Sequence, residues 1–132
     1  MNNDHLLHIA EAALQYAYAP YSRFKVGAAL AAKDGRIFTG CNIENSSYGL
    51  TLCAERVALA KAVSEGHRDF TAIAVASGSG SPITPCGACL QALYEFSPAL
   101  RVITTGRGKR NASCPLKQLL PRGFRLNEKT AR

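Results

Sequence analysis

Three cysteines and a glutamate in this sequence have the types and spacing that suit a catalytic metal. Cys53 and Glu55 stand two residues apart in "CAER", and Cys86 and Cys89 stand three apart in "PCGAC". Each motif opens an apolar run with the periodicity of a helix. The positive end of a helix dipole favours the thiolate that a metal needs, and helix N-termini gather at the carboxyl ends of parallel strands. We therefore expect the three sulfurs to meet at one zinc ion.

The number of ligands points to a catalytic metal rather than a structural one. Three protein ligands leave the fourth position of tetrahedral zinc open, whereas a structural site is closed by four. Cys41 and Cys114 lack motif spacing. The open position would hold water, whose pKa zinc lowers from about 15.7 to about 7. Glu55 could then take a proton from that water and return it to a substrate as general acid and base.

Arg56 follows the glutamate directly and has a role in the same chemistry. Three thiolates around zinc leave the centre with excess negative charge, and a guanidinium that donates to them would drain part of it. A C-x-x-C pair is also a redox motif or half of a zinc ribbon. A ribbon needs a second pair, which is absent. The redox interpretation leaves Cys53, Glu55 and Arg56 unexplained.

Hydrophobic periodicity gives the elements that must position these residues. An amphipathic helix is predicted over 4–18 with Asp4 as its cap, and a hairpin follows around Asp34-Gly35. The chain then alternates between helices and strands: helix 53–63, strand 70–77, helix 86–96, strand 100–105 and a short helix in 115–121. This order predicts a three-layer α/β/α sandwich with a mixed central sheet of about five strands, antiparallel at the hairpin and parallel at the helical crossovers.

Length and composition define the class of protein. The chain has 132 residues, 47% of them hydrophobic and 19% charged, which suits one domain over 1–132 with a real core. Its apolar runs are too short to span a bilayer. The N-terminus lacks the basic start of a signal peptide. We expect a cytoplasmic protein whose cysteines are reduced.

Basic residues gather in the C-terminal third of the chain. From residue 101 to residue 132 there are nine Lys and Arg against a single acidic residue, Glu128. Such a region is typical of a surface that binds nucleic acid or a phosphate, or of an ordinary solvated surface. No aromatic residue is interleaved with "RGKR" to stack on bases. We therefore expect a solvated surface and no nucleic-acid partner.

Two polar residues follow the predicted hairpin in "CNIEN". Side chains alternate along a strand, so Asn42 and Glu44 would lie on the same side. Polar residues at a strand end suit either the binding of ligand hydroxyls or turn and cap chemistry. The residues alone leave both interpretations open.

The motifs together resemble those of a known family. "CAER" with "PCGAC" is similar to the C-x-E…P-C-x-x-C zinc signature of nucleoside and nucleobase deaminases. Longer stretches resemble the small homotetrameric cytidine deaminases over roughly residues 14–124: "YAPYSRFKVGAAL", "DGRIFTGCNIENSSYGLTLCAERVAL", "AVSEG", "PCGACLQ" and "LLPRGF". The resemblance implies zinc-dependent deamination of cytidine and 2′-deoxycytidine to uridine and 2′-deoxyuridine, with release of ammonia, in pyrimidine salvage.

The resemblance also assigns roles. It implies one Zn²⁺ per subunit on the three cysteines and general acid and base catalysis by Glu55. It implies that Phe24 packs on the pyrimidine or sugar, that Asn42 and Glu44 bind the ribose hydroxyls, and that the backbone amide of Ala54 meets the base carbonyl. Two further residues would approach a site from a neighbouring subunit of the homotetramer: Tyr48 and Phe124.

Some features depart from the family pattern or allow other functions. Leu90 stands where the family usually has an arginine, and the end "RLNEKTAR" replaces an acidic tail. Deaminases of cytosine-containing antibiotics such as blasticidin S share "CAE" and "PCGxC", although "NIEN" resembles the cytidine enzymes. A zinc-stabilised module without turnover would leave Glu55 unexplained.

Overall fold

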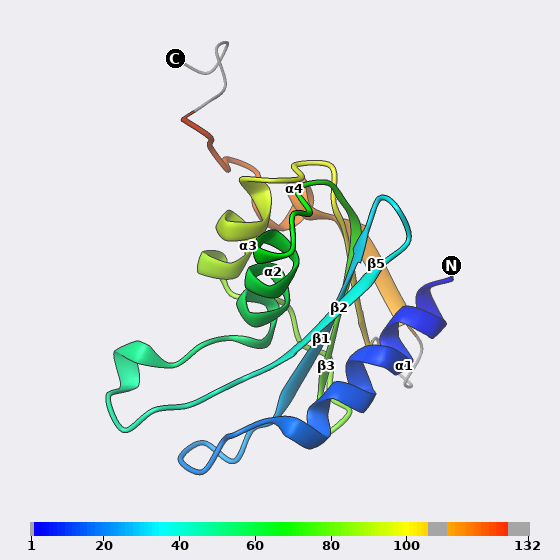
Figure 1. The fold of residues 1–132 in the computed structure, drawn as a ribbon. Helices are drawn as coiled ribbons and strands as arrows, with labels where there is room; N and C mark the ends of the chain where they lie inside the picture. The colour runs from blue at the N-terminus through cyan, green and yellow to red at the C-terminus, as the bar shows by residue number, and fades with distance from the viewer. Residues whose placement is uncertain (1, 106–110, 127–132) are drawn as a thin grey trace.

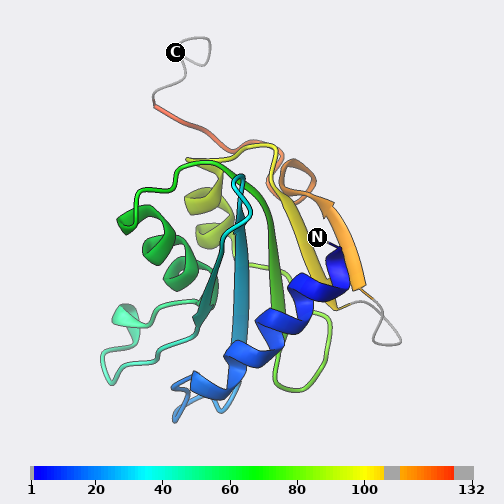
Figure 2. The same cartoon turned by 45° about the vertical axis from the view of Figure 1, so that its right-hand side comes forward.

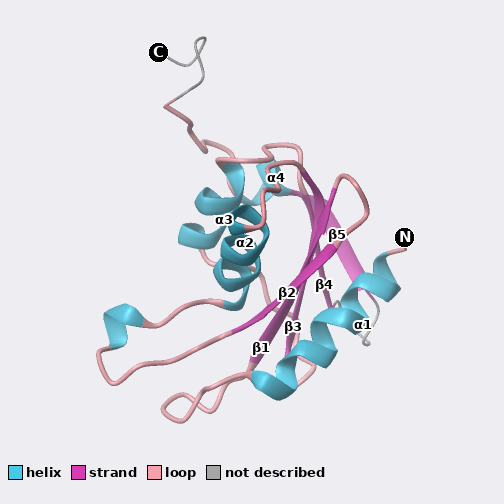
Figure 3. Cartoon of the chain, viewed as in Figure 1, coloured by secondary structure: helices cyan, strands magenta, loops and turns pink. Residues whose placement is uncertain are grey.

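The computed structural model describes residues 2–105 and 111–126. The basic stretch "RGKR" at 107–110 and the tail from residue 127 lie outside this part of the chain. The sandwich predicted from the sequence is confirmed: helices cover both faces of one five-stranded sheet (Figure 1; Figure 3). Across the described ranges, no helix combines the length and the apolar character needed to cross a membrane.

The first helix is shorter than predicted and has a different cap. Helix α1 spans Asn3–Ala13 and continues as one 3₁₀ turn, η1, over Leu14–Tyr16. Its N-cap is Asn2, whose side chain accepts a hydrogen bond from the His5 N–H at 2.7 Å. The prediction of Asp4 as the cap was wrong. Asp4 lies in the first helical turn, where its charge faces the positive end of the helix dipole.

The predicted hairpin is present, with a looser turn than the sequence suggested. Strand β1 spans Val26–Ala32 and pairs antiparallel with β2, Ile37–Cys41. The turn over residues 33–36 has φ of 96° at Gly35 alone, because Asp34 keeps a negative φ. The Asp34 carboxylate instead accepts the Arg36 N–H at 3.0 Å. A tight two-residue turn would need a positive φ at both Asp34 and Gly35. Here the hydrogen bond of the Asp34 side chain stabilises the turn with a positive φ at Gly35 only.

The sheet has the order β2-β1-β3-β4-β5. Strand β3 (Phe70–Ser77) pairs antiparallel with β1 and parallel with β4 (Arg101–Thr105). Strand β5, Asn111–Pro115, pairs antiparallel with β4 and forms one edge of the sheet. Its sequence, "NASCP", is mostly polar and lacks an apolar alternation, which explains why it was not located beforehand.

Each face of the sheet carries a different helical layer. Helix α1 crosses one face, as Figure 2 shows, while α2 (Ala54–Ser64), α3 (Gly87–Tyr94) and the short α4 (Leu116–Leu119) cover the other. Side chains of strand β1 alternate between the two faces of the sheet. Helices cover both faces, so β1 is buried on both sides. Leu30 joins the core below α2 and α3, and Ala29 and Ala31 lie below α1.

One glycine brings the start of α2 close to the sheet. A Cβ at Gly40 of β2 would lie 2.3 Å from the Ala54 carbonyl oxygen and 2.6 Å from the Ala58 nitrogen. No side chain fits in that space, so the first turn of α2 packs backbone to backbone on β2. This contact places the residues on either side of Ala54, which are Cys53 and Glu55.

Candidate active site

The three cysteines of the two motifs lie together at the starts of two neighbouring helices. Cys53 is the N-cap of α2 and Cys86 is the N-cap of α3. The sulfur atoms of Cys53, Cys86 and Cys89 all lie within 4.8 Å of one another, and those of Cys86 and Cys89 are 3.5 Å apart. Ligand sulfurs around tetrahedral zinc are separated by about 3.8 Å, given Zn–S bonds of about 2.3 Å. In residues 2–105 and 111–126, this is the one cluster of such side chains that could hold a metal.

The surroundings of the sulfurs suit a dication. Burial raises the pKa of Cys86, but hydrogen bonds outweigh burial, so the pKa is lowered. These hydrogen bonds come from the N–H and thiol of Cys89, the thiol of Cys53 and the N–H of Ala88. Burial, together with the nearby charge of Glu55, raises the pKa of Cys89. Soft thiolates favour zinc, Cu(I) and iron–sulfur clusters over hard cations such as Mg²⁺ and Ca²⁺. A neighbouring zinc ion would favour the ionised form of a thiol that burial otherwise keeps neutral.

Arg56 lies against these sulfurs from the first turn of α2. Its Nη2 donates to the Cys53 sulfur at 3.7 Å, and this hydrogen bond is the main reason that the pKa of Arg56 is raised. Its Nε is buried and has no hydrogen-bond partner among the described residues. The Arg56 guanidinium therefore contacts the sulfur cluster and offsets the negative charge of its thiolates.

Glu55 is the buried acid of the site. It is 5% exposed, and burial raises its pKa, against weaker opposing effects of its own backbone N–H and of Arg56. A carboxyl group whose pKa moves toward neutrality can both donate and accept a proton near pH 7. Glu55, Cys53 and Cys86 line one cavity of about 300 Å³.

The same cavity collects most of the residues expected to bind substrate. Phe24, Asn42, Glu44 and Ala54 all line it. They come from separate segments: the loop before β1, the segment after β2, and the first turn of α2. Nothing in the local sequence brings these segments together; the sheet and the Gly40 contact do so.

Asn42 and Glu44 also have structural hydrogen bonds. The Asn42 side chain accepts the Val26 N–H at 2.9 Å and donates to the Phe24 carbonyl at 2.8 Å. Glu44 accepts the N–H groups of Tyr21 and Ser22 at 3.0 and 3.1 Å. The two interpretations left open by the sequence are thus compatible, because residues that anchor the loops also line the cavity.

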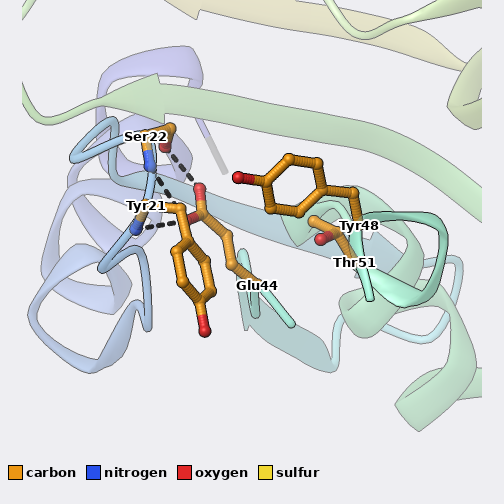
Figure 4. Close-up of a pocket in the computed structure, with 5 residues that line it drawn as sticks. All are labelled: Tyr21, Ser22, Glu44, Tyr48 and Thr51. Carbon is orange, nitrogen blue, oxygen red and sulfur yellow. Dashed lines mark hydrogen bonds between the residues drawn. The ribbon is translucent and has the colours of Figure 1, made fainter. Parts of the chain in front are cut away.

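A second cavity has a volume of about 310 Å³. Figure 4 shows the five residues that line it: Tyr21, Ser22, Glu44, Tyr48 and Thr51. Ser22, Glu44 and Thr51 also line the first cavity. Reasoning from the sequence did not single out Tyr21, Ser22 or Thr51. The stretch "PYSRF", which ends at Phe24, held the signal, since the hydroxyl side chains of Tyr21 and Ser22 lie within three residues of a predicted substrate contact.

Phe124 lies away from both cavities of its own chain. The Gln91 side chain of α3 donates to the Phe124 carbonyl at 2.7 Å, and Phe124 is 55% exposed. Its C-terminal segment leaves the molecule on the side opposite the loop that follows β2 (Figure 1). Phe124 is not among the residues that line either cavity.

Comparison with known proteins places these features in context. The profile of the cytidine and deoxycytidylate deaminase zinc-binding region matches residues 1–105. The chain is 49% identical to a cytidine deaminase of Halalkalibacterium halodurans, over 94% of this chain and 95% of that one. A crystal structure of cytidine deaminase from Burkholderia pseudomallei superposes with a TM-score of 0.88 at 48% identity, over 94% of this chain and 100% of the other. The cytidine deaminase of Mycobacterium tuberculosis gives a TM-score of 0.82 at 42% identity, over 94% and 98%.

Proposed function

The chain belongs to the cytidine and deoxycytidylate deaminase family, and we propose that it hydrolyses cytidine and 2′-deoxycytidine to uridine and 2′-deoxyuridine with release of ammonia. One observation carries this proposal. A three-cysteine cluster suited to zinc and a buried glutamate open into the cavity that Asn42 and Glu44 line. We further propose that residues 1–132 act as one catalytic domain.

Cys53, Cys86 and Cys89 would hold one Zn²⁺ per subunit, which matches the zinc-binding family and the donor set. A zinc ion bound there supplies Lewis acidity and lowers the pKa of water, so that a nucleophile is available at neutral pH. Arg56 donates to the Cys53 sulfur and limits the negative charge of the cluster. Cys41 and Cys114 take no part, since neither lies in the cluster.

Glu55 would move the protons of the reaction. Its carboxylate takes a proton from the attacking water and delivers it to the ring nitrogen next to the amino-bearing carbon. As the water oxygen bonds to that carbon, Glu55 would pass the remaining proton of the new hydroxyl group to the amino group. The C–N bond would then break, ammonia would leave, and the carbonyl of the uracil ring would form. Burial keeps competing solvent from the carboxyl group and raises its pKa toward the range in which both steps are efficient.

Four residues would orient the nucleoside. The Ala54 N–H is in the first turn of α2, where backbone N–H groups have no intrahelical acceptor, so it can donate to the base carbonyl. Phe24 would pack on the pyrimidine or the sugar. Asn42 and Glu44 would bind the ribose hydroxyls with the hydrogen-bonding capacity that their structural contacts leave free.

The surface around the site suits a homotetramer with shared active sites. Tyr48 is 74% exposed at the mouth of the second cavity, and further large apolar side chains are exposed nearby: Tyr18, Tyr21, Ile43, Leu50 and Leu52. Exposed apolar groups on this scale are typical of a protein interface. Tyr48 and Phe124 would each approach a site of a neighbouring subunit. The reaction would serve pyrimidine salvage, and zinc-binding thiols suit the reducing cytoplasm.

The proposal is tested by a substrate panel on protein of measured zinc content. Cytidine, 2′-deoxycytidine, cytosine, cytidine monophosphate and blasticidin S are followed side by side by ultraviolet absorbance. We expect turnover of the two nucleosides with about one zinc per subunit. Turnover of blasticidin S without turnover of cytidine would contradict the proposal. So would full activity in metal-free protein.

A further inference from the structure

Ser22 lies where the two cavities meet. It lines both of them, together with Glu44 and Thr51. Its hydroxyl donates to Oε2 of Glu44, as Figure 4 shows. The same oxygen accepts the Phe24 N–H at 3.0 Å. Because the Phe24 N–H occupies a lone pair of the hydroxyl, the hydroxyl proton is directed at Glu44.

The backbone around Ser22 holds this arrangement in place. Arg23 adopts a left-handed conformation with φ of 56°, which is unfavourable for a side chain of this kind. The contact from Ser22 Oγ to the Phe24 N–H closes the turn across Arg23, and the Arg23 N–H donates to the Ala19 carbonyl at 3.0 Å. A conformation of this cost persists only where surrounding contacts impose it. The position of the Ser22 hydroxyl is therefore set by the loop.

The carboxylate of Glu44 has little acceptor capacity left. Oε1 accepts the N–H groups of Tyr21 and Ser22 at 3.0 and 3.1 Å, and Oε2 accepts the Ser22 hydroxyl. An ionised carboxylate offers about four lone-pair sites, so about one site remains, on Oε2. Ser22 also contributes most to keeping the pKa of Glu44 below its usual value. An ionised carboxylate accepts only, and a ligand must therefore bring a hydroxyl to this site.

We propose that Ser22 is a positioning residue for the sugar of the substrate: its hydroxyl holds Oε2 of Glu44 so that the remaining lone pair faces one sugar hydroxyl. This inference rests on the proposed function, because it takes a nucleoside as the ligand of the first cavity. Ser22 itself need not touch the substrate. Its effect should therefore appear in KM, and only for a nucleoside that carries the hydroxyl which Glu44 accepts.

The test combines three variants with two substrates. Ser22→Ala removes the donor, Ser22→Thr keeps it, and Ser46→Ala is the matched control. Ser46 hydrogen-bonds the Tyr21 hydroxyl at 2.7 Å, and it lines neither of the two cavities. The substrates are cytidine and 2′,3′-dideoxycytidine, which lacks both secondary sugar hydroxyls. Steady-state KM and kcat are measured, with thermal melting to confirm folding.

We expect Ser22→Ala to raise the KM for cytidine about tenfold with kcat within about twofold, because a hydrogen bond to a charged group is lost. The KM for 2′,3′-dideoxycytidine should change less than about twofold. Ser22→Thr and Ser46→Ala should resemble the unmodified chain. Ser22→Cys, which keeps the shape with a weak donor, replaces the alanine variant if that variant does not fold.

Three results would overturn the inference while leaving the proposed function intact: an unchanged KM for cytidine in Ser22→Ala, an equal rise in KM for both substrates, or a KM for cytidine in Ser22→Thr that is raised as much as in Ser22→Ala. Failure of the proposed function would look different. In that case the unmodified, zinc-loaded chain would not deaminate cytidine.

Discussion

The metal end of the site and the sugar wall are built in different ways. The metal end consists of the first turns of α2 and α3 with Cys53, Glu55, Cys86 and Cys89, and the sugar wall consists of residues 21–24 and 42–51. Glu55 is 5% exposed at the metal end, whereas Tyr48 on the wall is 74% exposed. At the metal end Ala54, Glu55 and Cys89 are buried against the core, and Cys86 is exposed. The wall is held by hydrogen bonds between loops and leaves apolar side chains exposed.

This difference predicts a division of labour. Groups at the metal end would touch the reacting atoms, so their loss should lower kcat. Wall residues that line the first cavity would bind parts of the substrate that do not react, so their loss should raise KM. Substitutions in each region test this division.

The largest effect is expected from removal of a buried sulfur. In Cys89→Ala, two sulfurs remain, and three are needed to hold zinc with an open position. We expect zinc content to fall below about a tenth of an ion per subunit by atomic absorption, and deamination to become undetectable. Added zinc should not restore activity. The control is Cys114→Ala on β5, outside the cluster, which should keep zinc and activity.

The next largest effect separates the acid from the metal. Glu55→Gln is nearly isosteric and removes the proton carrier but no zinc ligand. We expect kcat for cytidine to fall about 10² to 10⁴-fold, the usual contribution of general acid and base catalysis, with zinc content and KM nearly unchanged. Kinetics followed by ultraviolet absorbance and zinc analysis on the same preparation would measure the loss of activity and the zinc content. Near-normal turnover would contradict the role of Glu55.

The metal end could be predicted from the sequence because its parts are local. Cys53 and Glu55 lie in one helical start and Cys86 and Cys89 in another, and the α/β order brings such starts to the same edge of a sheet. The structure confirms that the sulfurs come together. The catalytic roles remain predictions. The sandwich and its helices followed in the same way from hydrophobic periodicity.

The sugar wall could be predicted only in part: "CNIEN" left hydroxyl binding by Asn42 and Glu44 open, the family resemblance favoured it, and the role of Ser22 was not predicted. Ser22 and Glu44 are 22 positions apart in the chain, and their contact depends on how two loops meet. No short-range pattern encodes that meeting. The edge strand β5 was missed for a related reason, since its polar sequence is shaped by exposure rather than by a core. The cap at Asn2 was missed because Asp4 offers the same cap chemistry two residues later.

A packing substitution tests how strongly the metal end depends on the core. In Gly40→Ala, the new Cβ would lie 2.3 Å from the Ala54 carbonyl oxygen, so α2 must shift. Overpacking of this kind typically costs about 1–3 kcal/mol of the free energy of unfolding. Displacement of Cys53 and Glu55 should also lower kcat about 10- to 100-fold.

Urea denaturation and steady-state kinetics would measure the two effects of Gly40→Ala. The matched control is Gly78→Ala, whose new Cβ meets its nearest atom, on Lys25, at 3.5 Å, an ordinary contact. That variant should keep its stability and its kcat. A stable and fully active Gly40→Ala protein would show that β2 does not position the start of α2.

The smallest effect is expected from Glu44→Gln on the sugar wall, which can be compared directly with Glu55→Gln at the metal end. Glu44→Gln keeps an oxygen for the N–H groups of Tyr21 and Ser22 but loses the charge and acceptor that a sugar hydroxyl would use. We expect the KM for cytidine to rise about tenfold, as for the loss of one charge-assisted hydrogen bond, with kcat within about threefold. Glu55→Gln should show the opposite pattern under the same conditions.

A double-mutant cycle of Ser22→Ala and Glu44→Gln tests whether Ser22 affects KM through its hydrogen bond to Glu44. If Ser22 acts through Glu44, then Ser22→Ala should add less than about twofold to KM in the Glu44→Gln background, since residues that share one interaction are not additive. Independent, multiplied effects would separate the two residues. A fall in kcat for Glu44→Gln as large as that for Glu55→Gln would remove the distinction between the wall and the metal end, because binding of the sugar and the transfer of protons would then depend on the same groups.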